Sequence, residues 1–301
     1  MTITTWNPLQ DLDAPLHWRK PRVVRVGDLF RTGVLVDELN TAFAVMALCP
    51  QHTFQLPTNF GDTMAQYMCH PDRKRMIAST VMSISNMLAA KAGTHEARIK
   101  LDDFSAAFKG SGPFPNLHLG VIVTNKSHLP RVEHLLRTPA AVRFVACEGL
   151  TEEVVLPWNC CPTNPGDPSS CTIPGSCLCE LLHWLTVSGE TGKDARPLHP
   201  AWVRSLRDQC HAAGVAFSFL GWGEFAPLEK HHVMVTTGNY CFTPSGEKIF
   251  PDKESREIHV WPATETHSED CFSAIRVGAK ASGRTLDGVV WDEMVTKEPQ
   301  L

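Results

Sequence analysis

The strongest constraint on the fold is an alternation of short β-branched segments with amphipathic helical segments along residues 1–225. "NLHLGVIVTN" (116–125) is an apolar run bounded by polar residues, which is typical of a strand buried on both faces. "HPAWVRSLRDQCHAAG" (199–214) instead places its apolar residues on one face of a helix, with Pro200 in the first turn and Gly214 at the end. Buried strands that alternate with such helices form a parallel sheet covered by helices.

This alternation repeats six or seven times, which favours a (βα) barrel or part of one over a short open sheet. After residue 225 the pattern changes, and "HHVMVTTGNYCFTPSGEKIF" (231–250) predicts a β-hairpin. We therefore predict an α/β partial barrel at residues 1–225 and a C-terminal extension with a β-hairpin at residues 226–301. We expect strands at residues 2–6, 22–30, 52–58, 116–125, 141–150, 182–190 and 215–224, and helices at 36–49, 61–92, 128–138 and 199–214.

The N-terminal segment "MTITTWNPLQDLDAP" lacks the apolar core of a signal peptide. The longest apolar run, "TAFAVMALC", is far shorter than the roughly 20 residues that a membrane helix needs. We therefore expect a cytoplasmic protein without a membrane partner.

The net charge of −4 gives no overall attraction to nucleic acid. Two local sets of basic residues could nevertheless hold phosphates, which keeps nucleic acid as a weak candidate partner. For either set alone, solvated surface charge is the more ordinary interpretation. The sets are Arg19, Lys20, Arg22 and Arg25, and Arg276, Lys280 and Arg284.

Four carboxylates stand where predicted strands end: Asp28, Glu148, Glu190 and Glu224. In a parallel barrel the carboxyl ends of the strands meet at one edge, so these groups are candidates for a common cavity. Several carboxylates in one cavity raise each other's pKa or bind a cation. The alternative is structural: such groups cap the next helix or pair with arginines such as Arg196.

Five of the eleven cysteines lie in "NCCPTNPGDPSSCTIPGSCLC" (159–179). A thiolate site could be built from Cys161, Cys171, Cys177 and Cys179, with zinc or an iron–sulfur cluster as the metal. The spacing departs from the C-x2–4-C pairs of structural zinc sites, and a reducing compartment disfavours disulfides. We favour a plain irregular loop without a cofactor.

Several segments together resemble a phage-associated, radical-SAM-like family of unknown function, the phage gp-thirty-seven/gp-sixty-eight type. They include "LHLGVIVTN", "TPAAVRFVACEGL", "RVGAKASGRTLDGVVWDEM" and the long stretch at residues 188–224. The resemblance implies a partial (βα) barrel of the radical-SAM type and an origin in phage or prophage. Seven candidate cavity residues match the family's pattern: Asp28, Glu148, Glu190, Arg196, His199, Trp222 and Glu224.

The resemblance also implies a cysteine segment after an initial W-N-P, which would hold a [4Fe–4S] cluster for S-adenosylmethionine. Here Trp6, Asn7 and Pro8 are followed by "LQDLDAP", and no cysteine precedes Cys49. We therefore expect a divergent member that has lost the cluster and works as a binding or interaction protein, with a host or phage protein as its partner. The alternative is a metal-dependent enzyme, or a radical-SAM enzyme whose cluster ligands have moved to the cysteine-rich loop.

Overall fold

The computed structural model describes residues 3–92, 113–158, 181–228, 239–242, 248–249 and 272–293. The chain divides into two compact units. Unit 1 comprises residues 1–122, 130–145 and 297–301, and unit 2 comprises residues 123–129 and 146–296. The domain boundary expected near residue 225 stays a prediction. The cysteine-rich segment 159–179 lies outside the described residues.

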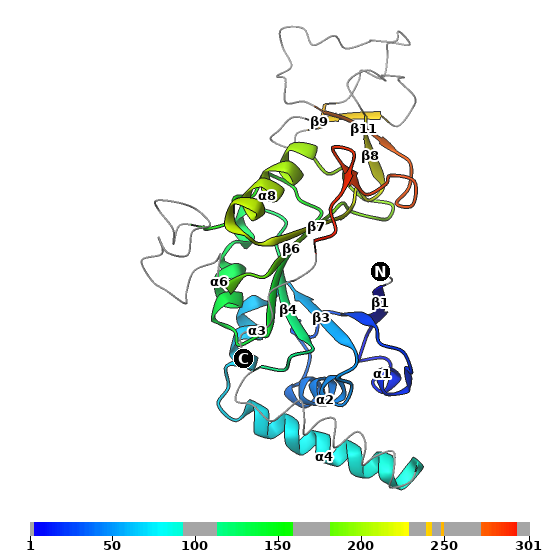
Figure 1. The fold of residues 1–301 in the computed structure, drawn as a ribbon, viewed down its shortest axis with the longest axis vertical. Coiled ribbons are helices and arrows are strands. Elements are labelled where there is room, and N and C mark those ends of the chain that lie inside the picture. Colours follow the sequence, from blue (N-terminus) through cyan, green and yellow to red (C-terminus); the bar gives the residue numbers. More distant parts are fainter. Residues whose placement is uncertain are drawn as a thin grey trace. The chain divides into compact units, whose positions relative to one another are not determined.

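Seven strands form one sheet, in which their spatial order is their order in the sequence (Figure 1). Their bounds are Ile3–Trp6 (β1), Val23–Val26 (β2), Thr53–Thr58 (β3), Leu117–Ile122 (β4), Val142–Glu148 (β5), Trp184–Ser188 (β6) and Ala216–Gly221 (β7). The pairs β1–β2, β2–β3, β3–β4 and β6–β7 are parallel. Sequential order with parallel pairing is the strand arrangement of a (βα) barrel. The predicted α/β fold with a parallel sheet is therefore confirmed, and each of the seven predicted strands is present.

The helices between the strands also follow the sequence pattern closely. Their bounds are Ala14–His17 (α1), Val36–Ala47 (α2), Gly61–Met68 (α3), Arg73–Ala92 (α4), Lys126–His128 (η1, a 3₁₀ turn), Pro130–Arg137 (α6) and Pro200–Ala213 (α8). The prediction of a single helical stretch over residues 61–92 is wrong, because the helix breaks between Met68 and Arg73. Pro71 lies in the break, and proline disfavours helical geometry at the residue before it.

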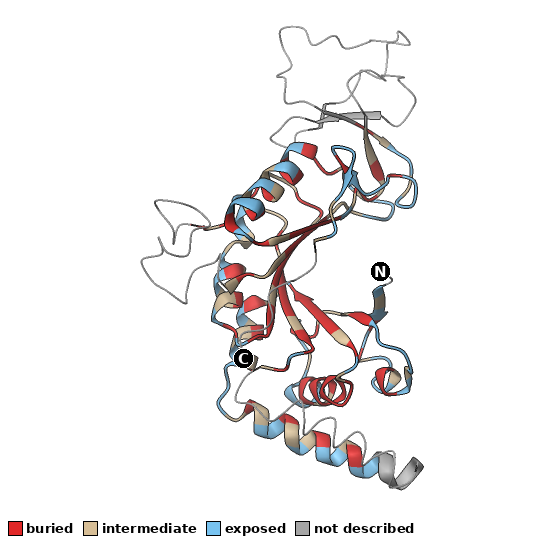
Figure 2. Ribbon diagram, in the orientation of Figure 1, coloured by how far each residue is buried: buried red, intermediate tan, exposed pale blue. Residues whose placement is uncertain are grey.

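The sheet of unit 1 has two faces of different chemistry. Trp6, Val24 and Phe54 lie on one face and are at most 3% exposed, and the Trp6 and Phe54 rings lie 5.7 Å apart. Figure 2 shows the central strands of the sheet in red, the colour of buried residues, over much of their length. Asn116, just before β4, donates hydrogen bonds from its side-chain amide to the carbonyl oxygens of Met46 (3.0 Å) and Cys49 (3.3 Å). These bonds join the end of α2 to the start of β4.

Unit 1 also contains a buried arginine that ties three segments together. The Arg73 guanidinium donates to the carbonyl oxygen of Tyr67 (2.9 Å) and to Oδ1 of Asn40 (2.9 Å). It also lies 3.6 Å from the centroid of the Tyr67 ring, whose hydroxyl donates to Asn40 Oδ1 (3.0 Å). Burial raises the pKa of Tyr67, although Arg73 partly offsets this. The network fixes the start of α4 against α2 and α3.

A second sheet lies in unit 2, with the strand order β10–β9–β11–β8. The strands are Phe225–Leu228 (β8), Asn239–Phe242 (β9), Lys248–Ile249 (β10) and Phe272–Arg276 (β11), and they pair antiparallel. The β9–β10 pair is the hairpin that the alternation within residues 231–250 predicted. The hairpin therefore belongs to a larger antiparallel sheet.

The last described segment packs against α8 and β7. Thr285–Leu286 (β12) and Val289–Val290 (β13) form a hairpin whose central residues, Asp287 and Gly288, have φ angles of 55° and 76°. Positive φ at both positions is typical of a type I′ turn, which Asp-Gly sequences favour.

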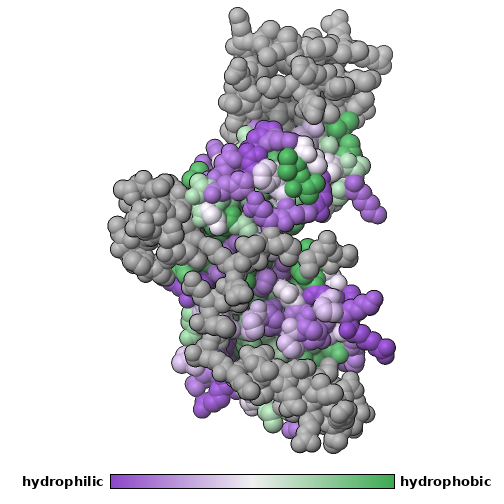
Figure 3. All heavy atoms as spheres, viewed as in Figure 1, coloured by the Kyte–Doolittle hydropathy of each residue, from purple (hydrophilic) through white to green (hydrophobic). Residues whose placement is uncertain are grey.

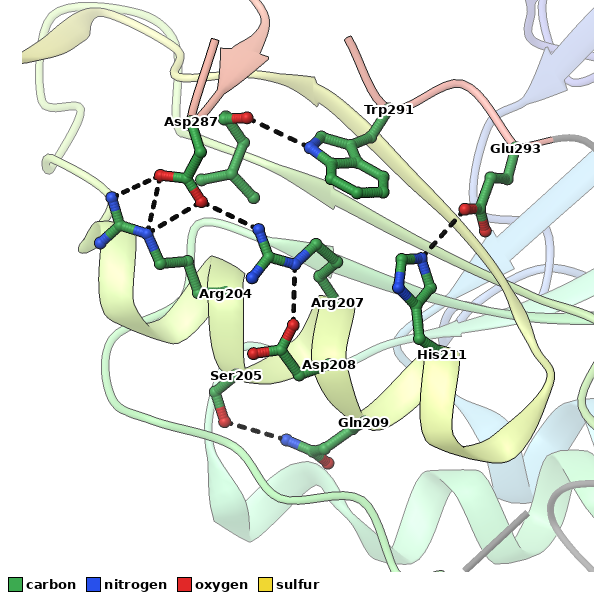
Figure 4. A network of polar contacts seen from close by, with 10 residues as sticks. Arg204, Ser205, Arg207, Asp208, Gln209, His211, Asp287, Trp291 and Glu293 are labelled. Carbon is green, nitrogen blue, oxygen red and sulfur yellow. Dashed lines mark hydrogen bonds and ion pairs between the residues drawn. The ribbon is translucent and has the colours of Figure 1, made fainter. Parts of the chain in front are cut away.

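The Asp287 carboxylate at this turn accepts hydrogen bonds from Arg204 (2.7 Å) and Arg207 (2.9 Å) of α8 (Figure 4). The chain then runs antiparallel along β7: Phe219 N donates to Trp291 O (2.9 Å), and Glu293 N donates to Phe217 O (3.2 Å). The segment thus occupies the outer edge of β7.

No helix among the described residues is long and apolar enough to span a membrane. On the face drawn in Figure 3, the hydrophobic side chains of the described residues form small patches among hydrophilic ones. Small, interrupted apolar patches are the ordinary surface of a folded domain.

Candidate functional site

The connection from β1 to β2 occupies the place where the resemblance implies a cluster-binding segment. The amides of Gln10 (3.0 Å) and Asp11 (3.1 Å) donate to Asn7 O, so the chain turns immediately after β1. The buried Trp6 ring donates from Nε1 to Asp11 O at 2.6 Å, which holds this turn against the sheet. A one-turn helix, α1, then leads into β2, and residues 7–22 contain no cysteine. The residues present here do not fit a thiolate-bound cluster.

Asp28 organises the carboxyl ends of β2 and β3 in unit 1. Its carboxylate accepts hydrogen bonds from the Thr58 hydroxyl (2.6 Å), from Asn59 N (3.1 Å) and from Phe30 N (3.2 Å). Arg131 of α6 extends the group, since its guanidinium donates to Asn59 Oδ1 at 2.9 Å. Burial lowers the pKa of Arg131, and the charge of Asp28 partly offsets this. The sequence indicated Asp28 as a strand-end residue, but it gave no sign that Arg131 joins the group.

A row of polar side chains crosses the other face of the unit 1 sheet. Thr5 pairs with Arg25, Arg25 with Gln55, and Gln55 with His118 in the strand register. Partners in register point to the same face of a sheet, so these four residues form one row, which we call the polar row. Gln55 is only 6% exposed, and Arg25 and His118 are half-buried. Strands of parallel sheets are ordinarily apolar on both faces, so the polar row distinguishes this face as a candidate binding surface.

The candidate residues of unit 2 form an interlocked group of loops rather than a set of unpaired carboxylates. Glu190, which follows β6, forms a bidentate ion pair with Arg196 and accepts a hydrogen bond from Arg196 N at 2.7 Å. Burial alone would raise the pKa of Glu190, but the hydrogen bonds from Arg196 outweigh it and hold this pKa below its usual range. Glu190 is therefore ionised near neutral pH, and it closes the loop that follows β6.

Glu224, which follows β7, joins the same loop. Its carboxylate accepts a hydrogen bond from Gly192 N at 3.0 Å, and its own amide donates to Glu190 O at 2.8 Å. Arg276 lies 3.7 Å from the Glu224 carboxylate and donates to the carbonyl oxygens of Gly192 (3.1 Å), Lys193 (3.0 Å) and Ala195 (3.2 Å). Sequence reasoning placed Arg276 in a basic set and missed its role in this loop cluster, which we define as residues 189–196, 222–224 and 276.

Two glycines allow the loops that follow β6 and β7 to lie in contact. A Cβ on Gly189 would lie 1.9 Å from Trp222 O, and a Cβ on Gly223 would lie 2.1 Å from Glu190 O. Both obstacles are backbone atoms, which cannot rotate away as a side chain can. Glycine is therefore required at both positions for the loops after β6 and β7 to approach.

Of the remaining candidate residues of unit 2, His199 and Trp222 make contacts that hold the structure together. His199 caps α8, since its Nδ1 accepts a hydrogen bond from Ala201 N at 3.1 Å, and its ring stacks on Trp202. Trp222 is 4% exposed and donates from Nε1 to Thr285 O at 3.0 Å. Glu148 is half-buried at the end of β5. Asp28 belongs to unit 1, so a shared cavity of all seven candidate residues stays a prediction.

The two basic sets differ in their surroundings. Arg19, Lys20 and Arg22 of unit 1 are exposed and take part in none of the ion pairs between described residues. In unit 2, Arg276 holds the loop cluster and Arg284 pairs with Asp292.

The proposed thiolate ligands Cys161, Cys171, Cys177 and Cys179 lie outside the described residues, so a metal site there stays a prediction. The described residues contain no group of three or more histidine, cysteine or acidic side chains arranged to hold a metal ion. Burial, followed by the charge of Glu148, raises the pKa of the described Cys147 to about 12. This thiol is therefore protonated and unreactive near neutral pH.

Comparison with known proteins identifies a family but no individual relative. No curated protein and no solved structure matches the chain. One family, described as "Protein of unknown function (DUF5131)", matches residues 3–295. This match includes nearly all of both units, with the polar row and the loop cluster. The chain therefore belongs to the DUF5131 family of proteins of unknown function.

Proposed function

We propose that this chain is a divergent radical-SAM-like protein of phage or prophage origin that has lost its iron–sulfur cluster and works as a binding protein. Its partner is a host or phage macromolecule, and its scaffold is the seven-stranded parallel sheet. The protein performs no radical chemistry, because that chemistry needs an electron from a bound cluster to cleave the sulfonium of S-adenosylmethionine.

The observation that carries this proposal is the connection between β1 and β2. The turn after Trp6 closes within five residues on the hydrogen bond from the Trp6 ring to Asp11 O. The chain then reaches β2 at Val23 through α1, without a cysteine. A cluster needs three thiolates from the protein to leave one iron for S-adenosylmethionine, and this connection supplies none.

The polar row supports a binding role. Strands of parallel sheets are usually apolar on both faces. Thr5, Arg25, Gln55 and His118 instead offer hydroxyl, guanidinium, amide and imidazole groups along one line of the sheet. These groups suit the recognition of a polar partner, for which a few well-placed polar groups give orientation and specificity.

The retained carboxylates fit the same interpretation. Asp28 accepts one hydrogen bond from its own loop and two from the end of β3, and Glu190 and Glu224 bind arginines and backbone amides. In these contacts the carboxylates hold the strand-end loops in place. A binding surface needs such rigid loops, since loops ordered in advance lose less entropy on binding.

Anaerobic purification followed by iron, sulfide and zinc analysis tests the proposal. We expect a colourless, folded protein with metal far below one equivalent per chain. A brown protein that contains iron and sulfide would overturn it in favour of a relocated cluster.

A variant with serine at Cys161, Cys171, Cys177 and Cys179 completes the design. If the native protein holds zinc or iron and this variant does not, the cysteine-rich loop is the metal site and the proposal fails. If neither protein holds metal and both show the same circular dichroism spectrum, the loss of the cluster is supported.

A further inference from the structure

We propose that the segment Trp18–Arg22, which we call the basic strip, binds the phosphate backbone of a nucleic acid. The strip presents three cations, Arg19, Lys20 and Arg22, in the connection between α1 and β2. This inference goes beyond the proposed function by naming a class of partner. It does not depend on the loss of the cluster, since the strip would carry the same charge in a metal-containing protein.

The cations of the strip are exposed and lack acidic partners among the described residues. The nearby contact between His17 Nε2 and the Asp13 carboxylate, at 3.5 Å, does not involve Arg19, Lys20 or Arg22. Three cations within four residues repel one another. A bound polyanion would relieve this repulsion and release its own counterions, which is the main source of affinity in backbone recognition.

Part of the strip is held in place before any ligand arrives. Arg22 N donates to His52 Nδ1 (3.2 Å), and the Arg22 guanidinium donates from one nitrogen to Thr4 Oγ1 (3.2 Å). The guanidinium also lies 5.0 Å from the centroid of the Trp18 ring. The centroids of the Trp18 and His52 rings are 5.5 Å apart, in an edge-to-face arrangement. An arginine has five N–H donors, so the bond to Thr4 leaves several for a phosphate oxygen. An arginine ordered in this way loses less entropy when it binds.

The distribution of charge along the chain favours unit 1 as the site for a polyanion. Unit 1 contains 16 lysines and arginines and 12 aspartates and glutamates, a formal charge of +4. Unit 2 contains 12 and 20 of these residues, a formal charge of −8. The net charge of −4 therefore conceals a basic unit. Its cations Arg19, Lys20 and Arg22 are exposed and have no acidic partner among the described residues, so they are the groups expected to attract phosphate.

A nucleic acid suits the strip better than an anionic membrane does. Sequences that bind anionic lipids carry clusters of about four to eight basic residues, often on an amphipathic helix. The strip has three exposed cations in an irregular connection, and its aromatic residue, Trp18, is half-buried against His52. A ring in that position supports Arg22 and does not present its face to acyl chains.

Fluorescence anisotropy with labelled oligonucleotides of about 20 nucleotides, single-stranded and duplex, measures the interaction as salt is raised. If the three cations each contact a phosphate, the slope of log affinity against log salt is about −2 for single strands. Affinity then falls by about twenty-fold between roughly 50 and 200 mM salt. The double variant Arg19→Gln/Lys20→Gln keeps the packed Arg22 and should reduce the slope to about −0.7.

The matched control is Arg31→Gln/Lys280→Gln, which removes two exposed cations outside the strip. It should bind like the native protein, because its cations are not part of the site. Equal binding by the control and the double variant would overturn the proposal, as would no binding by the native protein at the lowest salt. Binding to vesicles rich in anionic lipid without binding to either oligonucleotide would assign the strip to a membrane and overturn it as well. None of these outcomes depends on the metal content, so a failure here is separate from a failure of the proposed function.

Discussion

The basic strip of unit 1 and the glycine-rich segment 276–284 of unit 2 both bring arginine and lysine together, yet their surroundings differ. Among the described residues, Arg19 and Lys20 take part in no ion pair, and the contacts of Arg22 are with the neutral groups of His52, Thr4 and Trp18. In the second segment, Arg276 binds three carbonyl oxygens and lies 3.7 Å from Glu224. A similar density of charge therefore has two different environments: in unit 2 the cations hold loops together, and in unit 1 they form the phosphate site that we propose.

The largest expected effect tests whether the loop cluster of unit 2 is structural. Gly223→Ala would place a Cβ 2.1 Å from Glu190 O at a residue whose φ is 77°. We expect a loss of unfolding free energy of about 3 kcal/mol or more, since the clash is with backbone. Urea denaturation followed by circular dichroism measures it.

Gly192→Ala is the matched control for this substitution. Gly192 also has a positive φ, 97°, but a Cβ there would meet nothing within 4 Å. Only the backbone strain remains, about 1–2 kcal/mol. Equal losses in the two variants would show that the close approach of the loops does not contribute to stability.

Arg276→Ala should have the next largest effect. It removes three hydrogen bonds to carbonyl oxygens of the loop after β6 and the contact of the guanidinium with the Phe225 ring at 4.7 Å. We expect a loss of about 2 kcal/mol in the same urea assay, reduced from the full value of these bonds because the side chain is partly exposed. Lys280→Ala, an exposed cation of the same segment, should leave stability within about 0.5 kcal/mol of the native protein. A loss for Lys280→Ala as large as that for Arg276→Ala would contradict the distinction.

Asp287→Asn should give a smaller effect that depends on pH. The hydrogen bonds from Arg204 and then Arg207 hold the pKa of Asp287 below its usual range, so ionised Asp287 stabilises the fold. This contribution is present above the unfolded pKa of about 4 and is lost as the pH falls through the lower folded value. We expect a loss of about 0.5–1 kcal/mol at pH 7, discounted because the side chain is 38% exposed, and almost none near pH 2. Urea midpoints at several pH values test this, and a loss that is constant with pH would exclude the ion pairs as its cause.

The smallest effect on stability is expected in the basic strip. Arg19→Ala/Lys20→Ala removes exposed cations without ion-pair partners among the described residues, so the unfolding free energy should change by less than about 0.5 kcal/mol. At low salt the change should favour stability slightly, because the repulsion within the strip is relieved. A loss above about 1 kcal/mol would mean that these residues hold the fold together, as Arg276 does.

Much of the fold could be predicted from periodicity alone. The seven strands of the parallel sheet and helices α2 and α8 occur where the apolar patterns indicate, because buried strands and amphipathic helices have distinct periods. The break between α3 and α4 was missed although Pro71 marks it. Apolar residues continue on both sides of the break, so the helical period hid a short interruption.

The candidate site could be predicted less well, because its contacts join residues distant in the sequence. Asp28 was found as a strand-end carboxylate, but Arg131 lies about one hundred residues further on, and nothing in its local sequence links it to Asn59. The polar row was missed for a different reason. Gln55 and His118 each stand alone within a largely apolar strand, and only the register of neighbouring strands brings them together.

The pairing of Trp291–Glu293 along β7 has a consequence for how such a sheet can grow. A parallel barrel extends by adding strands that run in the same direction, whereas this segment runs the opposite way and uses the amide of Phe219 and the carbonyl oxygen of Phe217. It thereby stops strand addition at β7, both by an eighth strand of the same chain and by an edge strand of another molecule. A chain truncated before Trp291 would present β7 as an open template, and self-association of that truncated protein is the expected result.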